Sequence, residues 1–215
     1  MYCYKSDQRP CPRVYSVVAR LRSAFVLYIQ LIPDGHHFLP TIIIPFTHCY
    51  QTMVKNTVVL KGPLKLAHPP RTITTNRVLS FYAQYAVDFT TAKTTTSPTK
   101  YYASTAILVN TDQSIIHGAE AIWGYYIHLY EPFKCCVHDV ISMTLLSDEG
   151  TDVHTLIVET INNLHLKNGK EPVSLPQSFV YEIAKSQGGT GMYGLQINQV
   201  RCYFDRGLLQ KAAST

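Results

Sequence analysis

The clearest hydrophobic pattern follows residue 76. Apolar and aromatic side chains recur every three or four residues, at Val78, Phe81, Tyr82, Tyr85 and Phe89. This spacing is typical of a helix with one apolar face. Residues 74–76 supply side chains that can cap its beginning, and residues 94–98 favour a turn after it. We therefore predict a long amphipathic helix from about residue 75.

Beyond residue 100 the predicted elements are shorter. Residues 101–109 predict a short helix or an extended piece leading into a strand, residues 111–113 a hairpin turn, and residues 114–117 a return strand. Gly118 then precedes a second helix with an apolar stripe, and Pro132 ends it because proline cannot continue a helix. A helix, a short hairpin and a second helix are expected in that order.

Four longer strand-like segments complete the chain, at residues 135–146, 153–166, 173–184 and 195–204. Asn168-Gly169 lies between two of them, and Asn-Gly is a strong hairpin signal. An antiparallel sheet of this length needs a helix to cover its apolar face. The predicted fold class is α+β, a curved antiparallel sheet wrapped around the long first helix, in one domain of residues 71–215.

The first 70 residues show no such order. Their apolar runs at residues 24–32 and 39–46 fall short of the roughly 20 residues that cross a bilayer. The pattern of a signal peptide is not met either. We expect residues 1–70 to be an irregular, poorly ordered extension. Residues before Met53 can alternatively precede the true start, so their presence in the mature protein stays open.

The net charge is also concentrated in the first part of the chain. Of the net charge of +5, +3 lies in residues 1–52, so the predicted domain is nearly neutral. Nucleic acid and membrane are therefore not expected as partners, and a small apolar or aromatic metabolite is favoured. Cysteines and histidines show no metal-ligand spacing, so no metal and no cofactor are expected. The default compartment is the reducing cytoplasm.

Two stretches of sequence resemble a known family. "YYASTAILVNTDQSIIHGAEAIWGYYIHLYEPF" contains Gly118, Ile122 and Trp123 at the start of the second helix, and "LQINQVRCYFDRGLL" contains an Ile-x-x-Val-Arg-x-Tyr-x-Asp pattern ending at Asp205. Both resemble the nuclear transport factor 2-like superfamily, in particular its SnoaL-like branch, over about residues 75–210. The resemblance implies a cone-shaped domain with a pocket at its open end, which is often a homodimer through the outer sheet face.

Members of that superfamily include isomerases, dehydratases, cyclases and non-catalytic binding domains, so fold alone does not give the function. We predict a cofactor-independent isomerase, cyclase or dehydratase acting on a polyketide- or terpenoid-like metabolite by general acid/base proton transfer. The alternative is a non-catalytic ligand-binding or protein-interaction domain of the same fold.

Two adjacent residues are candidates for the base. Strict alternation along residues 135–146 places Asp139 on the more apolar face, with Val137 and Ile141, where desolvation would raise its pKa. His138 would then point outward, although a bulge would change which of the two faces the helix. His138 titrates near neutrality and is the second candidate. For each, an ordinary surface position is the competing interpretation.

Other candidates would shape the pocket. Tyr85 is a candidate catalytic residue and Tyr82 a pocket residue, because a buried tyrosine hydroxyl can stabilise an enolate; the competing interpretation is aromatic core packing. Further pocket candidates are Trp123, Phe179, Arg201 and Tyr203. Arg201 can alternatively form an ion pair with Glu159 or Glu182.

One motif is set aside. Residues 189–194 match G-x-G-x-x-G, but an alternating strand follows them instead of the helix that a dinucleotide site requires. We interpret these glycines as a hairpin loop.

Overall fold

The computed structural model describes residues 16–18, 28–30, 56–148 and 150–214. The chain divides into two compact units, residues 1–49 and residues 50–215. In the first unit, β1 (Ser16–Val18) and β2 (Tyr28–Gln30) pair antiparallel. Apart from these two strands, residues 1–55 lie outside the described residues. The expectation that they form an irregular extension lies outside them as well.

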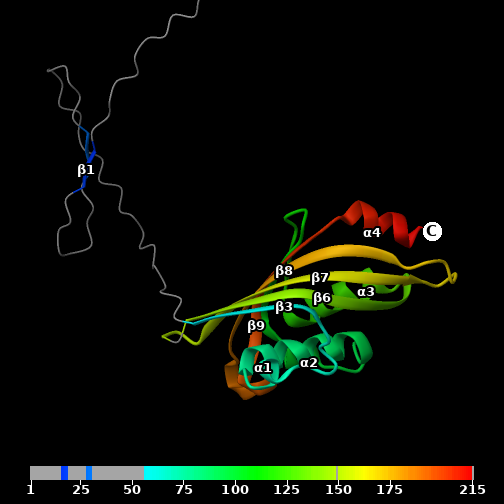
Figure 1. The fold of residues 1–215 in the computed structure, drawn as a ribbon, viewed down its shortest axis with the longest axis horizontal. Helices are drawn as coiled ribbons and strands as arrows, with labels where there is room; N and C mark the ends of the chain where they lie inside the picture. Colours follow the sequence, from blue (N-terminus) through cyan, green and yellow to red (C-terminus); the bar gives the residue numbers. More distant parts are fainter. Residues whose placement is uncertain (1–15, 19–27, 31–55, 149, 215) are drawn as a thin grey trace, which may run out of the picture. The chain divides into compact units, whose positions relative to one another are not determined.

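Within the described part of the second unit, seven strands form one sheet in the order β3-β6-β7-β8-β9-β4-β5. Their bounds are β3 Asn56–Leu64, β4 Tyr102–Val109, β5 Ile115–His117, β6 Phe133–Asp148, β7 Val153–Leu166, β8 Val173–Lys185 and β9 Leu195–Phe204. Neighbours pair antiparallel except β4 and β9, which run parallel. The four long predicted strands are confirmed, and Figure 1 shows them as one curved sheet.

The sheet begins earlier than the sequence suggested. Residues 56–64, expected to be part of the irregular extension, form β3 and pair with residues 140–147 of β6. Val58 and Leu60 alternate with exposed positions and pack partly buried against the core. Gly62-Pro63 interrupts this short pattern, so periodicity alone did not reveal the strand.

The long predicted helix is α2 (Arg77–Thr91), preceded by the single turn α1 (Arg71–Thr74). The side chain of Asn76 accepts hydrogen bonds from the backbone N–H groups of Val78 and Leu79, which satisfies two donors that the helix leaves unpaired. The apolar face predicted for α2 is buried in the core. Figure 1 shows α1 and α2 together on one side of the sheet.

The second helix is α3 (Ala119–Tyr130), which follows the β4–β5 hairpin as predicted. Gly118 precedes it with a φ of 89°, a value that favours glycine. The last helix, α4 (Arg206–Ala213), was not predicted. Asp205 caps it by accepting from the N–H of Leu208, and α4 contacts β7 and β8.

Two bulges change which side chains face the helices. In β6, Val140 pairs with Thr160 and Ser142 with Glu159, which leaves Ile141 as an extra residue. In β9, Ile197 pairs with Ile183 and Gln199 with Glu182, which leaves Asn198 unpaired in the same way. Each extra residue reverses the alternation of side chains along its strand.

Candidate functional site

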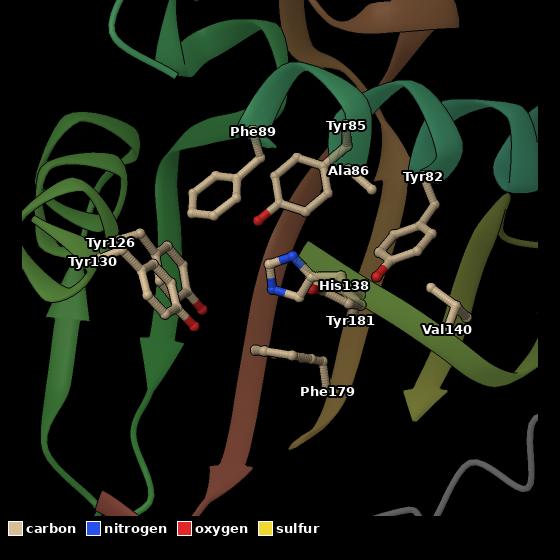
Figure 2. A pocket seen from close by; sticks show the side chains of 10 residues that line it. All are labelled: Tyr82, Tyr85, Ala86, Phe89, Tyr126, Tyr130, His138, Val140, Phe179 and Tyr181. Carbon is tan, nitrogen blue, oxygen red and sulfur yellow. The ribbon is translucent and has the colours of Figure 1, made fainter. Parts of the chain in front are cut away.

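A small cavity lies between the two long helices and the concave face of the sheet. Its volume is about 40 Å³, and helices α2 and α3 and strands β6 and β8 contribute its walls. The lining residues are Tyr82, Tyr85, Ala86, Phe89, Tyr126, Tyr130, His138, Val140, Phe179 and Tyr181. Figure 2 shows the imidazole of His138 among these aromatic rings. None of these lining side chains except His138 titrates near neutral pH.

His138 is the imidazole that lines this cavity. Its partly buried ring lies 6.4 Å from the rings of Phe89 and Tyr130, in edge-to-face geometry with both. Burial lowers its pKa from 6.5 to about 4, and the nearby Asp139 only partly opposes this shift. The imidazole is therefore neutral at pH 7, and its lone pair is available to accept a proton or a hydrogen bond.

The tyrosine hydroxyls around it form a buried group of donors. The hydroxyl oxygens of Tyr85 and Tyr102 are 2.9 Å apart. Burial raises the pKa of Tyr85 to about 12 and raises the pKa values of Tyr82 and Tyr181 as well. These phenols remain protonated, so they can donate hydrogen bonds at any physiological pH.

Some buried polar atoms near the cavity have no hydrogen-bond partner. They are the Tyr126 hydroxyl, both amide atoms of Asn162 and the Oε1 of Gln177, considering the described residues alone. Gln177 donates through its Nε2 to the Tyr130 hydroxyl, at 3.1 Å. Asn162 lies directly opposite His138 in the register of β6 and β7.

Asp139 does not lie in the cavity, so the predicted placement of its carboxylate is wrong. Its side chain is on the opposite face of β6 and accepts a hydrogen bond from Asn163 at 2.7 Å. The reason is the bulge at Ile141, which turns Val140, His138 and Cys136 toward the helices. The alternative with His138 facing the cavity is the one that the structure shows.

The bulge at Asn198 moves two other candidates in the same manner. Val200 and Cys202 face the core, whereas Arg201 and Tyr203 are exposed and line a separate hollow of about 210 Å³ with Asn110 and Gln113. The prediction that Arg201 and Tyr203 line the ligand pocket is therefore wrong. Tyr82, Tyr85 and Phe179 do line the cavity.

Trp123 lies behind the cavity wall. Its indole stacks on the Tyr101 ring with a 14° interplanar angle, and its N–H donates to the backbone oxygen of Lys93 at 2.7 Å. It packs edge-to-face against Tyr85 and Phe89, which do line the cavity. The side chain therefore holds two lining residues in place instead of contacting a ligand, and the prediction of Trp123 as a pocket residue is corrected.

A larger groove adjoins the cavity. It measures about 310 Å³ and lies between residues 64–68, the side of α2 and residues 137–139 of β6. Ala86 and His138 line both the groove and the cavity. These two side chains thus stand between the interior of the sheet and the surface.

Several lining residues were not singled out from the sequence. Tyr181 lies two residues after Phe179 on β8, so alternation from that residue could have found it. Tyr130 follows Tyr126 by one helical turn on α3. Asn162, which pairs opposite His138 without lining the cavity, carried no signal, because an asparagine in a strand is typical of an ordinary polar position.

Metal and membrane features were also sought over the same described ranges. No cluster of three or more His, Cys, Asp or Glu side chains there could hold a metal ion. No helix in that part of the chain is long and apolar enough to cross a membrane.

The fold and site together define a small α+β domain with a curved open sheet enclosing an aromatic cavity. Neither a protein-family model nor a curated protein sequence matches the chain. Among solved structures, the chain is similar to the Kfla4162 protein from Kribbella flavida, with a TM-score of 0.51 and 12% identity over 66% of this chain and 98% of that one. LinA is similar with a TM-score of 0.50 and 12% identity, over 63% and 88% of the two chains.

A nuclear transport factor 2 from Cryptosporidium parvum also matches, with a TM-score of 0.47 and 15% identity over 63% of this chain and 96% of that one. At these identities the matches show the fold alone, and the chain shares the fold of the Kfla4162 protein and of LinA.

Proposed function

We propose that this domain binds a small, largely apolar or aromatic metabolite at His138 and transfers a proton on it without a cofactor. The reaction would be of the isomerase, dehydratase or cyclase type, and the metabolite polyketide- or terpenoid-like. The observation that supports this most is a neutral imidazole facing an otherwise aromatic cavity. LinA, which has the same fold, is named a hexachlorocyclohexane dehydrochlorinase.

In this proposal His138 accepts a proton from a carbon next to a carbonyl group. A tyrosine hydroxyl, from Tyr85 or Tyr82, would donate a hydrogen bond to the developing enolate oxygen. An imidazole with a pKa of about 4 is a weak base, so the phenol must carry much of the stabilisation. Both groups lie in the cavity wall, and water is largely excluded there.

The size of the cavity limits how a metabolite can bind. A volume of about 40 Å³ holds little more than one water molecule. A ring-sized ligand would therefore occupy the adjoining groove of about 310 Å³ and reach the cavity between Ala86 and His138. Rotation of the His138 ring would widen this passage.

The direct test is to identify by mass spectrometry what co-purifies with the protein, and then to assay that compound. His138→Gln should abolish turnover, whereas Asp139→Asn should change KM at most and keep kcat, because that carboxylate borders the groove and not the cavity where the proton is transferred. Equal losses in both variants, or full activity in His138→Gln, would reject the assignment of the base.

The second candidate is non-catalytic binding by the same cavity. The weak basicity of His138 favours it, since a neutral imidazole can hold a ligand by a hydrogen bond without accepting its proton. One result distinguishes catalysis from binding alone. A co-purified compound that is released chemically unchanged after long incubation supports binding alone.

We also propose a homodimer contact on the outer face of the sheet. Val137, Ile141 and Tyr203 are 43%, 41% and 48% exposed there, an unusual exposure for large apolar side chains. Analytical ultracentrifugation should show a dimer that Ile141→Glu converts to a monomer. A monomeric wild-type protein at micromolar concentration would exclude this contact.

A further inference from the structure

Next to the aromatic cavity lies a cluster of buried polar side chains that the proton transfer does not use. Asn162 is fully buried on β7, and Gln177 on β8 is 5% exposed. The Tyr126 hydroxyl, from α3, lies in the cavity wall itself. Figure 2 shows Tyr126 and Tyr130 extending from α3 in the same direction, with their hydroxyls at the same end.

These groups hold unpaired hydrogen-bonding atoms of both kinds. The Tyr126 hydroxyl and the amide nitrogen of Asn162 can donate, and the amide oxygens of Asn162 and Gln177 can accept. Burial raises the pKa of the Tyr130 hydroxyl, and the nearby amides of Gln177 and Asn162 partly oppose this shift. Each buried polar atom left unpaired destabilises the fold, so a cluster of four requires an explanation.

The pairing of the strands places this cluster next to His138. Asn162 pairs opposite His138, and Gln177 pairs opposite Thr160, which in turn pairs with Val140. Directly opposed side chains on one face have Cβ atoms about 5 Å apart. A ligand that touches His138 therefore brings its polar atoms near Asn162 and Tyr126.

The charge of the surroundings limits what that ligand can be. None of the lining side chains is cationic at pH 7, because His138 is neutral and the others are aromatic or aliphatic. A carboxylate or phosphate would be buried there without a counter-charge, which is costly. The unpaired atoms instead suit a neutral group that both donates and accepts, such as a carboxamide or a hydroxy-ketone.

We propose that Asn162, Gln177 and Tyr126 form a polar subsite that selects ligands with a neutral donor-and-acceptor group attached to an apolar ring. The inference rests on the proposed function, since it uses the same cavity. It adds the part of the ligand that the base does not contact.

Three probes with a common phenyl ring test the selection: toluene, benzamide and benzoate. Dissociation constants can be obtained from titrations of the full ¹⁵N-labelled chain. Benzamide should bind about tenfold more tightly than toluene, and benzoate more weakly than benzamide by at least that factor. Equal affinity of benzamide and toluene, or a preference for benzoate, would overturn the subsite and leave the apolar cavity standing. Failure of all three probes to bind would overturn the cavity as a ligand site and the subsite with it.

Matched variants assign the selection to residues. Tyr126→Phe and Asn162→Leu should each lose the preference for benzamide over toluene. Tyr125→Phe is the control, because its buried hydroxyl is also unpaired but does not line the cavity. Asn163→Leu serves likewise on the outer face of β7. A preference that survives in both test variants, or that the control variants also lose, would overturn the proposal.

The melting temperature of the Asn162→Leu variant is a second test of the subsite. Asn162→Leu should melt at or above the temperature of the wild-type protein, because it removes an unpaired buried amide. A lower melting temperature would show that the amide is already satisfied within the unliganded protein, and the subsite would be rejected.

Discussion

At the scale of single residues, the properties of the site come from burial without a charged partner. His138 has the Asp139 carboxylate next to it in sequence but on the opposite face of the strand, so no carboxylate inside the cavity supports its protonated form. The surrounding phenols remain protonated for the same reason, as burial penalises their anions. The site is neutral as a whole, and that favours neutral ligands.

The low pKa of His138 makes stability depend on pH. In the unfolded chain the imidazole titrates near 6.5, and in the folded protein near 4. Between these values the unfolded state binds more protons, so this contribution is intact above pH 6.5 and is lost as the pH falls toward 4. The full loss is about 3 kcal/mol. Urea unfolding of wild type and His138→Gln at pH 7 and pH 4 measures it, and an equal pH dependence in both would contradict the burial of His138.

Alternation along β6 predicted Asp139 inside the sheet, whereas His138 is the side chain that lines the cavity. Alternation with period two was applied through Ile141 and through Asn198, and both are extra residues in their strands. A bulge depends on pairing with the neighbouring strand, which the sequence of one strand does not contain. This single cause explains the misplacement of Asp139, Arg201 and Tyr203.

At the scale of elements, the first long helix was the most predictable. Its period, its cap and its end all agreed, and α2 begins directly after Asn76. The strand β3 and the helix α4 were missed because each is short and its apolar positions pack against the core only at one edge.

The cap of α2 can be tested on its own. Asn76→Ala removes the oxygen that accepts from Val78 and Leu79, and should lower the free energy of unfolding by about 1 kcal/mol. Asn76→Ser should recover most of that loss. Chemical denaturation measures both; no difference between the alanine and serine variants would contradict the capping role.

Helix α3 contains an exposed glycine that no close contact requires. A Cβ at Gly124 would meet no atom within 4 Å, so Gly124→Ala should stabilise the protein by up to about 1 kcal/mol. By contrast, a Cβ at Gly191 would clash with the backbone oxygen of Leu195, so Gly191→Ala should destabilise the protein. Melting temperatures that move in the same direction would contradict these environments.

At the scale of the whole molecule, the sheet of the second unit starts before the predicted domain does. β3 pairs with β6 along the edge of the sheet, next to the groove that adjoins the cavity. A polypeptide of residues 50–215 should therefore unfold at the temperature of the full chain, whereas one of residues 71–215 should unfold several degrees lower. Calorimetry of the three chains decides this, and equal transitions for the two shortened chains would contradict a structural role for β3.

Our central proposal is a ligand site between the two long helices and the sheet, with His138 facing into it. Titration of the ¹⁵N-labelled protein with toluene, followed by two-dimensional NMR, tests this most directly. We expect shifts centred on His138 and Ala86 and on residues 64–68 of the groove, with Asn163 unchanged. Shifts confined to the outer face, or none at saturating toluene, would contradict it.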